Sequence, residues 1–295
     1  MKKIISVILV VLMTTAVFSS CSKSGLKQEK LAYTYDSYYS EFDKDVVKSF
    51  EKLCNAVVKG EKSVKFDIAT LEDASRLYYT SFPLSVLVEK ISLNEKENGL
   101  DIVYVNDLET HKKLVSEFIE KVNEIMEECG YNKVSQKEFI LNAYSYVASK
   151  IEYDVNYTTT YDAIVKGFGS TSSYTSTLNY LLLQAGINTT QVYGLNSNGL
   201  SFMSMVEIDN ENYLFAPCNE NKANKGFGLS FFGMSYSDVL KLGFTDGFKY
   251  TNEEAVVFDE TSEKYSNLRN TVSFEYEDGT ISAIKADGSS VQVEL

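Results

Sequence analysis

The chain of 295 residues carries 28 Lys and Arg against 41 Asp and Glu, so its formal net charge is −13 at neutral pH. A surface with this excess of carboxylates repels phosphate backbones, which argues against a nucleic-acid partner. The chain has one histidine, His111, which excludes a zinc site built on several histidines. We expect neither a metal nor a cofactor.

The N-terminus, MKKIISVILVVLMTTAVFSSC, has the features of a secretory signal. Two lysines precede an apolar run over residues 4–18, which is shorter than the roughly 20 residues that span a membrane. The FSSC ending resembles a bacterial lipobox. We therefore expect a lipoprotein signal peptide over residues 1–20, lipid on Cys21, a tether over residues 21–30, and a membrane-anchored location in the bacterial cell envelope. The alternative is an ordinary signal peptide cleaved near Ser20.

Residues 31–130 are predicted to form a mainly helical N-terminal region. Apolar residues recur at helical spacing before Gly60 and again before Gly130, and both glycines are typical of helix ends. The predicted elements are helices over 41–59, 70–80 and 107–129, the last capped by Asp107, and strands over 63–68, 86–93 and 100–105.

Two cysteines and the histidine lie on these helices. Cys54 and Cys129 fall on the apolar faces, which predicts buried free thiols. His111 lies in the polar stretch ETHKK, which predicts a solvated or half-buried surface histidine.

Residues 131–250 change from helical to alternating periodicity. Ser135 and Glu138 have the spacing of a capping box, and they open a helix that runs to residue 151. The stretch GFGS predicts a turn into a second helix, over 171–185. Strands are predicted over 190–195, 200–208 and 212–216, followed by a polar loop over 219–225.

The remaining residues, 251–295, are predicted to be a β-rich tail. Two Asp-Gly turns separate alternating segments after residue 271, which predicts a small three-stranded meander. Helices that precede an antiparallel sheet place the whole chain in the α+β class.

Five segments between residues 135 and 244 stand out by their order and spacing: YVASKIEYD, GFGSTSSYTSTLNYLLLQAGI, VYGL, SFMSMVEIDNENYLFAP and LSFFGMSYSDVLKLGF. Together they resemble a bacterial transglutaminase-like domain of the lipoprotein type. The resemblance implies a papain-like core, with helices packed on an antiparallel sheet. It also implies a cysteine at the N-terminus of a central helix, activated by a histidine and an aspartate on adjacent strands.

All three catalytic positions implied by the resemblance carry other residues here. The family's nucleophile stands three residues before a helix tyrosine, which is Tyr174 here, so that position is Thr171. The histidine position becomes Ser201, and the aspartate position, just before Pro217, becomes Ala216. The site therefore looks degenerate.

Other nucleophiles remain open alternatives. Thr171 or Ser172 would need a base, and the sequence points to none; the simpler interpretation is that Ser170 or Thr171 caps the helix. Cys218 follows Pro217 at a strand end, without a helix N-terminus or a histidine, which favours a partly buried thiol.

Two acidic stretches have simple structural interpretations. Glu152 to Asp154 is interpreted as the end of a structural helix. The stretch IDNEN is interpreted as a hairpin turn, since it is too short for a dedicated calcium loop.

The leading hypothesis is a pseudoenzyme that binds a peptide or glycan in the former active-site cleft, lined by Thr171, Tyr174 and Ser201. The first alternative is an amide hydrolase or acyl transferase that uses Thr171, Ser172 or Cys218. The second alternative is a structural partner in a surface assembly.

Overall fold

The computed structural model describes residues 31–36, 42–196, 199–244, 248–250, 255–256 and 262–295. Helices make up 44% and strands 26% of it, which confirms a mixed helix and sheet fold. The expected signal peptide, Cys21 and the tether lie outside the described residues. Within the described ranges, no helix is both long enough and apolar enough to cross a membrane.

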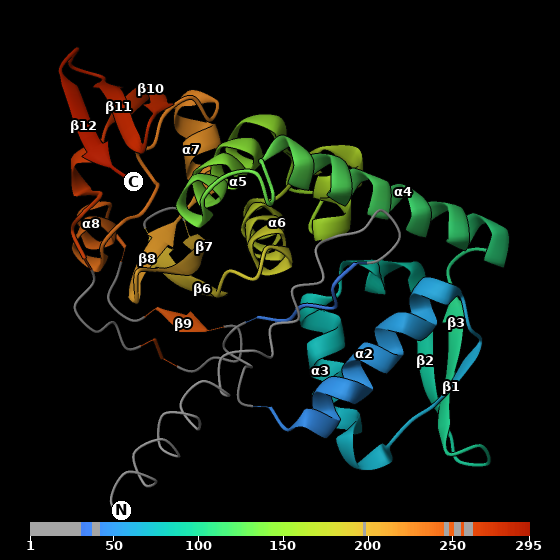
Figure 1. The fold of residues 1–295 in the computed structure, drawn as a ribbon. Coiled ribbons are helices and arrows are strands. Elements are labelled where there is room, and N and C mark those ends of the chain that lie inside the picture. The colour runs from blue at the N-terminus through green and yellow to red at the C-terminus, as the bar shows by residue number, and fades with distance from the viewer. Residues whose placement is uncertain (1–30, 37–41, 197–198, 245–247, 251–254, 257–261) are drawn as a thin grey trace, which may run out of the picture.

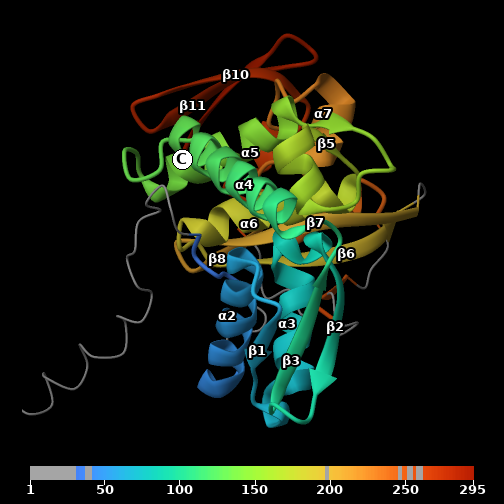
Figure 2. The ribbon, with the colours of Figure 1, turned by 90° about the vertical axis from the view of Figure 1, so that its right-hand side faces the viewer.

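The N-terminal part of the fold is a pair of helices against a small sheet, and both views place it beside the larger body (Figures 1 and 2). Asp43 caps the first helix, which buries one apolar stripe and ends at Gly60 with φ 71°. The sheet has the antiparallel order β1-β3-β2. The elements are α2 (Lys44–Lys59), β1 (Ser63–Lys65), η2 (Ile68–Thr70), α3 (Leu71–Ser81), η3 (Pro83–Leu87), β2 (Val88–Asn94) and β3 (Gly99–Tyr104).

Three longer helices form the centre of the molecule. They are α4 (Leu108–Glu128), α5 (Gln136–Lys150) and α6 (Thr171–Gln184). The side chains of Asp107 and Ser135 accept hydrogen bonds from backbone N–H groups in the first turns of α4 and α5. This confirms the cap at Asp107 and the Ser135 half of the predicted capping box. Helix α6 is buried along most of its length, between α5 and the main sheet (Figure 1).

The main sheet is antiparallel, with the order β8-β7-β6-β9. The hairpin of β7 and β8, at one side of the sheet, turns at Asp209 and Asn210, whose φ angles of 56° and 64° suit a two-residue turn that follows the strand twist. IDNEN is thus a hairpin turn, as predicted. The strands are β6 (Thr189–Asn196), β7 (Gly199–Ile208), β8 (Glu211–Phe215) and β9 (Lys249–Tyr250).

The C-terminal residues form the predicted meander, drawn in red beside α5 and α7 (Figure 1). Asp278 and Gly279, both at positive φ, make its first turn. Ile281 and Ala283 are buried and join the main hydrophobic core. The last elements are α7 (Pro217–Asn224), α8 (Tyr236–Lys241), η5 (Ser266–Leu268), β10 (Thr271–Glu277), β11 (Thr280–Lys285) and β12 (Ser290–Glu294).

The predicted polar loop over 219–225 is wrong, because these residues belong to α7 and its C-cap. Pro217 starts the helix, where its missing N–H costs nothing. Two polar side chains of α7, Glu220 and Asn221, are buried and hydrogen-bonded to other parts of the fold. Their polarity concealed the helix, since tertiary partners replace the apolar stripe that periodicity detects.

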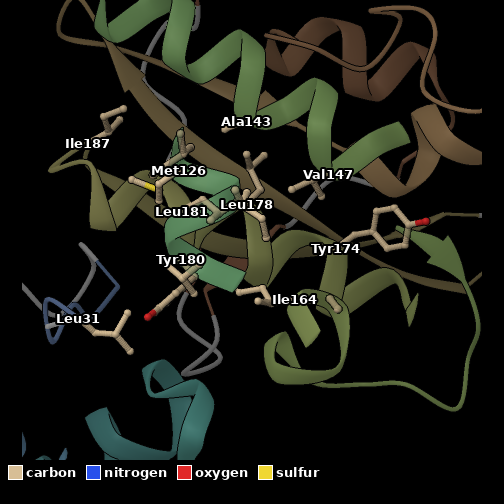
Figure 3. Packing of buried hydrophobic residues seen from close by; sticks show 14 of the residues in the cluster. Leu31, Met126, Ala143, Val147, Ile164, Tyr174, Leu178, Tyr180, Leu181 and Ile187 are labelled. Carbon is tan, nitrogen blue, oxygen red and sulfur yellow. The ribbon is translucent and has the colours of Figure 1, made fainter. Parts of the chain in front are cut away.

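One continuous core joins the helices, and Figure 3 shows part of it around α6. Leu178 and Leu181 of α6 pack there with Met126 of α4 and Val147 of α5. Because α6 presents apolar groups to neighbours on several sides, the start of this helix has a fixed position in the fold.

Candidate functional site

The turn before α6 is held by two short parallel strands, β4 (Glu152–Tyr153) and β5 (Phe168–Gly169). The N–H of Ser170 donates to the carbonyl of Tyr157 at 2.7 Å. A Cβ atom at Gly169 would lie 2.8 Å from the Ser173 hydroxyl and 3.2 Å from Ile151, so the close approach requires glycine. The interpretation of residues 152–154 as a helix end is wrong, because their backbone pairs with this turn.

Hydroxyl groups cluster at the first turn of α6. Ser170 occupies the N-cap position, but its side chain makes no cap hydrogen bond to the helix. Its Oγ instead lies 3.0 Å from Ser172 Oγ and 3.3 Å from Ser173 Oγ. The prediction that Ser170 caps the helix through its side chain is therefore wrong, because neighbouring hydroxyls take up that oxygen.

Tyr174 is a structural anchor in this fold. Its side chain is fully buried, and its hydroxyl donates to the carbonyl of Ile151 at the end of α5. Burial raises the pKa of Tyr174, so the hydroxyl remains a donor. Tyr174 is expected from the sequence to line a ligand cleft with Thr171 and Ser201, but its side chain has no exposed surface.

Thr171, Ser201 and Ala216 lie on α6, on β7 and just after β8. Helix α6 packs on β7, and Ser204 of that strand donates to the carbonyl of Thr175 at 3.5 Å. Thr171 is half-buried, whereas Ser201 and Ala216 are buried. These positions supply two hydroxyls and a methyl group, and no thiolate, imidazole or carboxylate.

The prediction that Cys218 lies at a strand end, away from any helix N-terminus, is wrong. It is the second residue of α7, so it does lie at a helix N-terminus, and its Sγ is 3.7 Å from Thr171 Oγ1. A thiol from another element thus lies beside Thr171. Its side chain is 1% exposed, and burial raises its pKa against smaller lowering effects of Thr171 and Lys222.

His111 does not serve as a base for Cys218, because it is buried against Val57 of α2. It is fully buried, which corrects the expected surface position, and its Nε2 lies 2.7 Å from the carbonyl oxygen of Val57. Its ring centroid is 4.1 Å from that of Tyr104. The polar stretch ETHKK misled the prediction because His111 faces inward, toward the end of α2.

The buried thiols should resist alkylation in the native protein. Cys54, Cys129 and Cys218 are all free and buried, as predicted for the first two, and burial raises the pKa of Cys129 to about 12. In the chain from Ser22 to Leu295, we expect iodoacetamide to modify each at least about tenfold more slowly than in the unfolded chain. Mass spectrometry of digests gives each rate. Fast native labelling of Cys218 would contradict its burial.

A groove of about 310 Å³ lies on another side of α6. Its three walls are residues 79–83, 85 and 86 from the end of α3 into η3, residues 158–160, and α6 side chains between Ser172 and Leu183; Asp36 and Gln191 also line it. Sequence reasoning missed this groove, because its walls meet only through the tertiary fold. Within the described residues, no group of three His, Cys, Asp or Glu is arranged to hold a metal ion.

No protein-family model matches the chain, and no curated protein matches it significantly. Three solved structures are similar to parts of it. One, described as a candidate cysteine protease from Cytophaga hutchinsonii, is 14% identical over 34% of this chain and 37% of that one, with a TM-score of 0.29. A structure described as a TGase is 14% identical over 54% of this chain and 40% of the other, with a TM-score of 0.34. A candidate protease from Parabacteroides distasonis is 9% identical over 58% of this chain and 35% of the other, with a TM-score of 0.32. The matches cover less than half the length of each of these three structures.

Proposed function

We propose that this protein is a lipid-anchored protein of the bacterial envelope that binds a peptide or glycan at the start of α6 without covalent chemistry. The observation that carries the proposal is the side-chain chemistry at Thr171, Ser201 and Ala216. A thiolate, an imidazole and a carboxylate at these positions would make and orient a nucleophile, whereas hydroxyls and a methyl group do not.

The fixed structure around these positions supports binding of a ligand at the start of α6. The Gly169 turn, the buried Tyr174 and the packing of α6 on β7 hold the start of the helix in place. Thr171 keeps part of its surface exposed there and offers a hydroxyl for a neutral polar ligand.

The second candidate is an amide hydrolase or acyl transferase with Cys218 as the nucleophile. The 3.7 Å separation from Thr171 Oγ1 favours it. Its burial and raised pKa oppose it, because thiolate is the reactive form and a substrate carbonyl must reach the sulfur. His111, the chain's one imidazole, is bound to Val57.

Enzyme assays separate the two candidates. For the chain from Ser22, we expect no amine incorporation and no peptide hydrolysis above background in the wild type, Thr171→Ala or Cys218→Ala. An active transglutaminase and an active cysteine protease serve as positive controls. Wild-type turnover that Cys218→Ala abolishes would establish the second candidate, and turnover lost in Thr171→Ala would identify a threonine nucleophile.

Binding is tested on the same three proteins. A panel of short neutral peptides and oligosaccharides is screened by thermal shift, since a ligand raises Tm in proportion to its affinity and concentration. We expect a shift in the wild type that is smaller in Thr171→Ala. The binding proposal fails if no probe shifts the wild type, or if Thr171→Ala responds equally.

A further inference from the structure

The groove between α3 and α6, defined above by its three walls, is separate from the Thr171 position. Ser172, Ser176 and Asn179 line it from α6, whereas Thr171, Ser201 and Cys218 do not. Its volume of about 310 Å³ lies at the lower end of the range for small-molecule pockets, about 300–1,000 Å³. The groove therefore has room for a small ligand.

Two largely buried polar residues of α6 line this groove. Asn179 is 6% exposed, and its Oδ1 accepts a hydrogen bond from Thr189 Oγ1 at 2.9 Å. Tyr180 is 5% exposed, and its hydroxyl points out of the core cluster, toward the side of Leu31 (Figure 3). Within the described residues, neither the Asn179 amide N–H groups nor the Tyr180 hydroxyl makes a hydrogen bond to protein, and neither is among the fully enclosed polar atoms, so both are open to solvent or to a ligand.

Because these two groups are not enclosed by protein, they are available to hydrogen-bond a ligand in the groove in place of water. Burial raises the pKa of Tyr180, which keeps its hydroxyl protonated and able both to donate and to accept. The Asn179 amide contributes donors. The two groups together match a ligand that carries hydroxyl oxygens.

The charge of the groove argues for an uncharged ligand. Among its described lining residues there is no Lys, Arg or His, so it holds no cation to pair with a phosphate or carboxylate. Asp36 lines it too, and its Oδ2 accepts a hydrogen bond from the N–H of Gln191 at 2.8 Å. With a net charge of −13, the chain as a whole also repels anions.

The opposite wall offers apolar surface of the kind that sugar rings contact. Tyr79 is 61% and Val86 38% exposed on this wall, and the buried Phe82 and Pro83 lie between them in the chain. A tyrosine ring gives flat apolar area with a polar edge, which suits the C–H face of a pyranose. An extended peptide would instead favour a free strand edge, and these walls come mainly from helices and a loop.

We propose that the groove between α3 and α6 is a binding site for an uncharged saccharide, held by the Asn179 amide and the Tyr180 hydroxyl against the Tyr79 wall. The site does not depend on ligand binding at Thr171. The groove would therefore be a saccharide-binding site separate from the one proposed at the start of α6.

The test is saccharide binding by the chain from Ser22 to Leu295. The probes are neutral mono- and disaccharides of glucose, galactose, mannose and N-acetylglucosamine, with glucose 6-phosphate and gluconate as charged analogues. Ligand-observed NMR detects binding at millimolar concentration, and titration gives Kd. We expect neutral sugars to bind and the charged analogues to bind more weakly.

Tyr180→Phe removes the hydroxyl and keeps the ring that packs on Phe118. We expect Kd to rise about three- to tenfold, the effect of one lost hydrogen bond. Thr158→Trp adds bulk at an exposed position on the groove wall and should weaken binding at least as much. The matched control is Tyr265→Phe, which removes another buried hydroxyl without a partner, at a residue that does not line the groove.

The proposal is overturned if no neutral sugar binds, if short peptides bind this groove instead, or if Tyr180→Phe and Thr158→Trp leave Kd unchanged. A sugar response that is lost in Thr171→Ala but kept in Tyr180→Phe also overturns it, and would place the ligand at the start of α6. Loss in both groove variants, with normal binding in Tyr265→Phe, supports it.

Discussion

Replacing Glu220 with alanine is expected to lower the free energy of unfolding by about 3–5 kcal/mol, because a buried acceptor of several hydrogen bonds is lost. Glu220 is fully buried. Its carboxylate accepts hydrogen bonds from the Tyr144 hydroxyl at 2.9 Å, the Phe231 N–H at 2.7 Å and the Asn224 amide at 2.7 Å. Each donor left without a partner costs about 1–3 kcal/mol, partly relieved if water enters. Urea unfolding of both proteins measures the difference.

Glu220→Gln is the matched control, because it keeps the shape and one acceptor oxygen. We expect a loss well below that of Glu220→Ala. Burial raises the pKa of Glu220 above its ordinary value, so the folded protein holds that proton more tightly than the unfolded chain does. The resulting stabilisation is present below the unfolded pKa and is lost as the pH rises through the folded pKa.

The glutamine variant carries no titrating group there, so its stability relative to the wild type should improve as the pH rises from acid toward neutral. Equal effects of alanine and glutamine would contradict the hydrogen-bond account. A relative stability independent of pH would contradict the raised pKa. Either result bears on the site, because Glu220 fixes α7, and α7 carries Cys218 to Thr171.

Gly226→Ala is expected to destabilise the fold by about 3 kcal/mol. Gly226 has a φ of 80°, which costs a residue with a side chain about 1–2 kcal/mol. A Cβ there would also lie 2.5 Å from the carbonyl carbon of Ala148 and 2.6 Å from its oxygen, and this backbone of α5 has no room to move. Overpacking of this kind adds about 1–3 kcal/mol. Thermal and urea unfolding give the loss.

Gly288→Ala is the control for Gly226. Its φ of 82° is nearly the same, but an added Cβ would meet nothing within 4 Å. We expect a cost of about 1–2 kcal/mol, from the backbone conformation alone. If both variants lose the same amount, the close contact between Gly226 and α5 does not determine the stability.

Local patterns predicted most of the secondary structure because the signals are themselves local. The β6–β7–β8 strands and the C-terminal meander follow from alternation and from Asp-Gly or Asp-Asn turns. Asp107 and Ser135 cap their helices as expected. Ser170 occupies a predicted cap position, yet its oxygen bonds to neighbouring hydroxyls, since residue type fixes what a side chain can do and its surroundings select the partner.

What the sequence by itself determined is the mixed fold class, the positions of most elements and the residue types at Thr171, Ser201 and Ala216, which exclude a Cys-His-Asp set there. The papain-like arrangement of the core stays a prediction. The tertiary structure alone decided that His111 is buried, that Cys218 lies beside Thr171, and that the groove at Tyr180 exists. The reason is physical: burial and contacts between residues distant in the chain depend on how elements pack, and polar residues such as Glu220 become interior only where that packing supplies their partners.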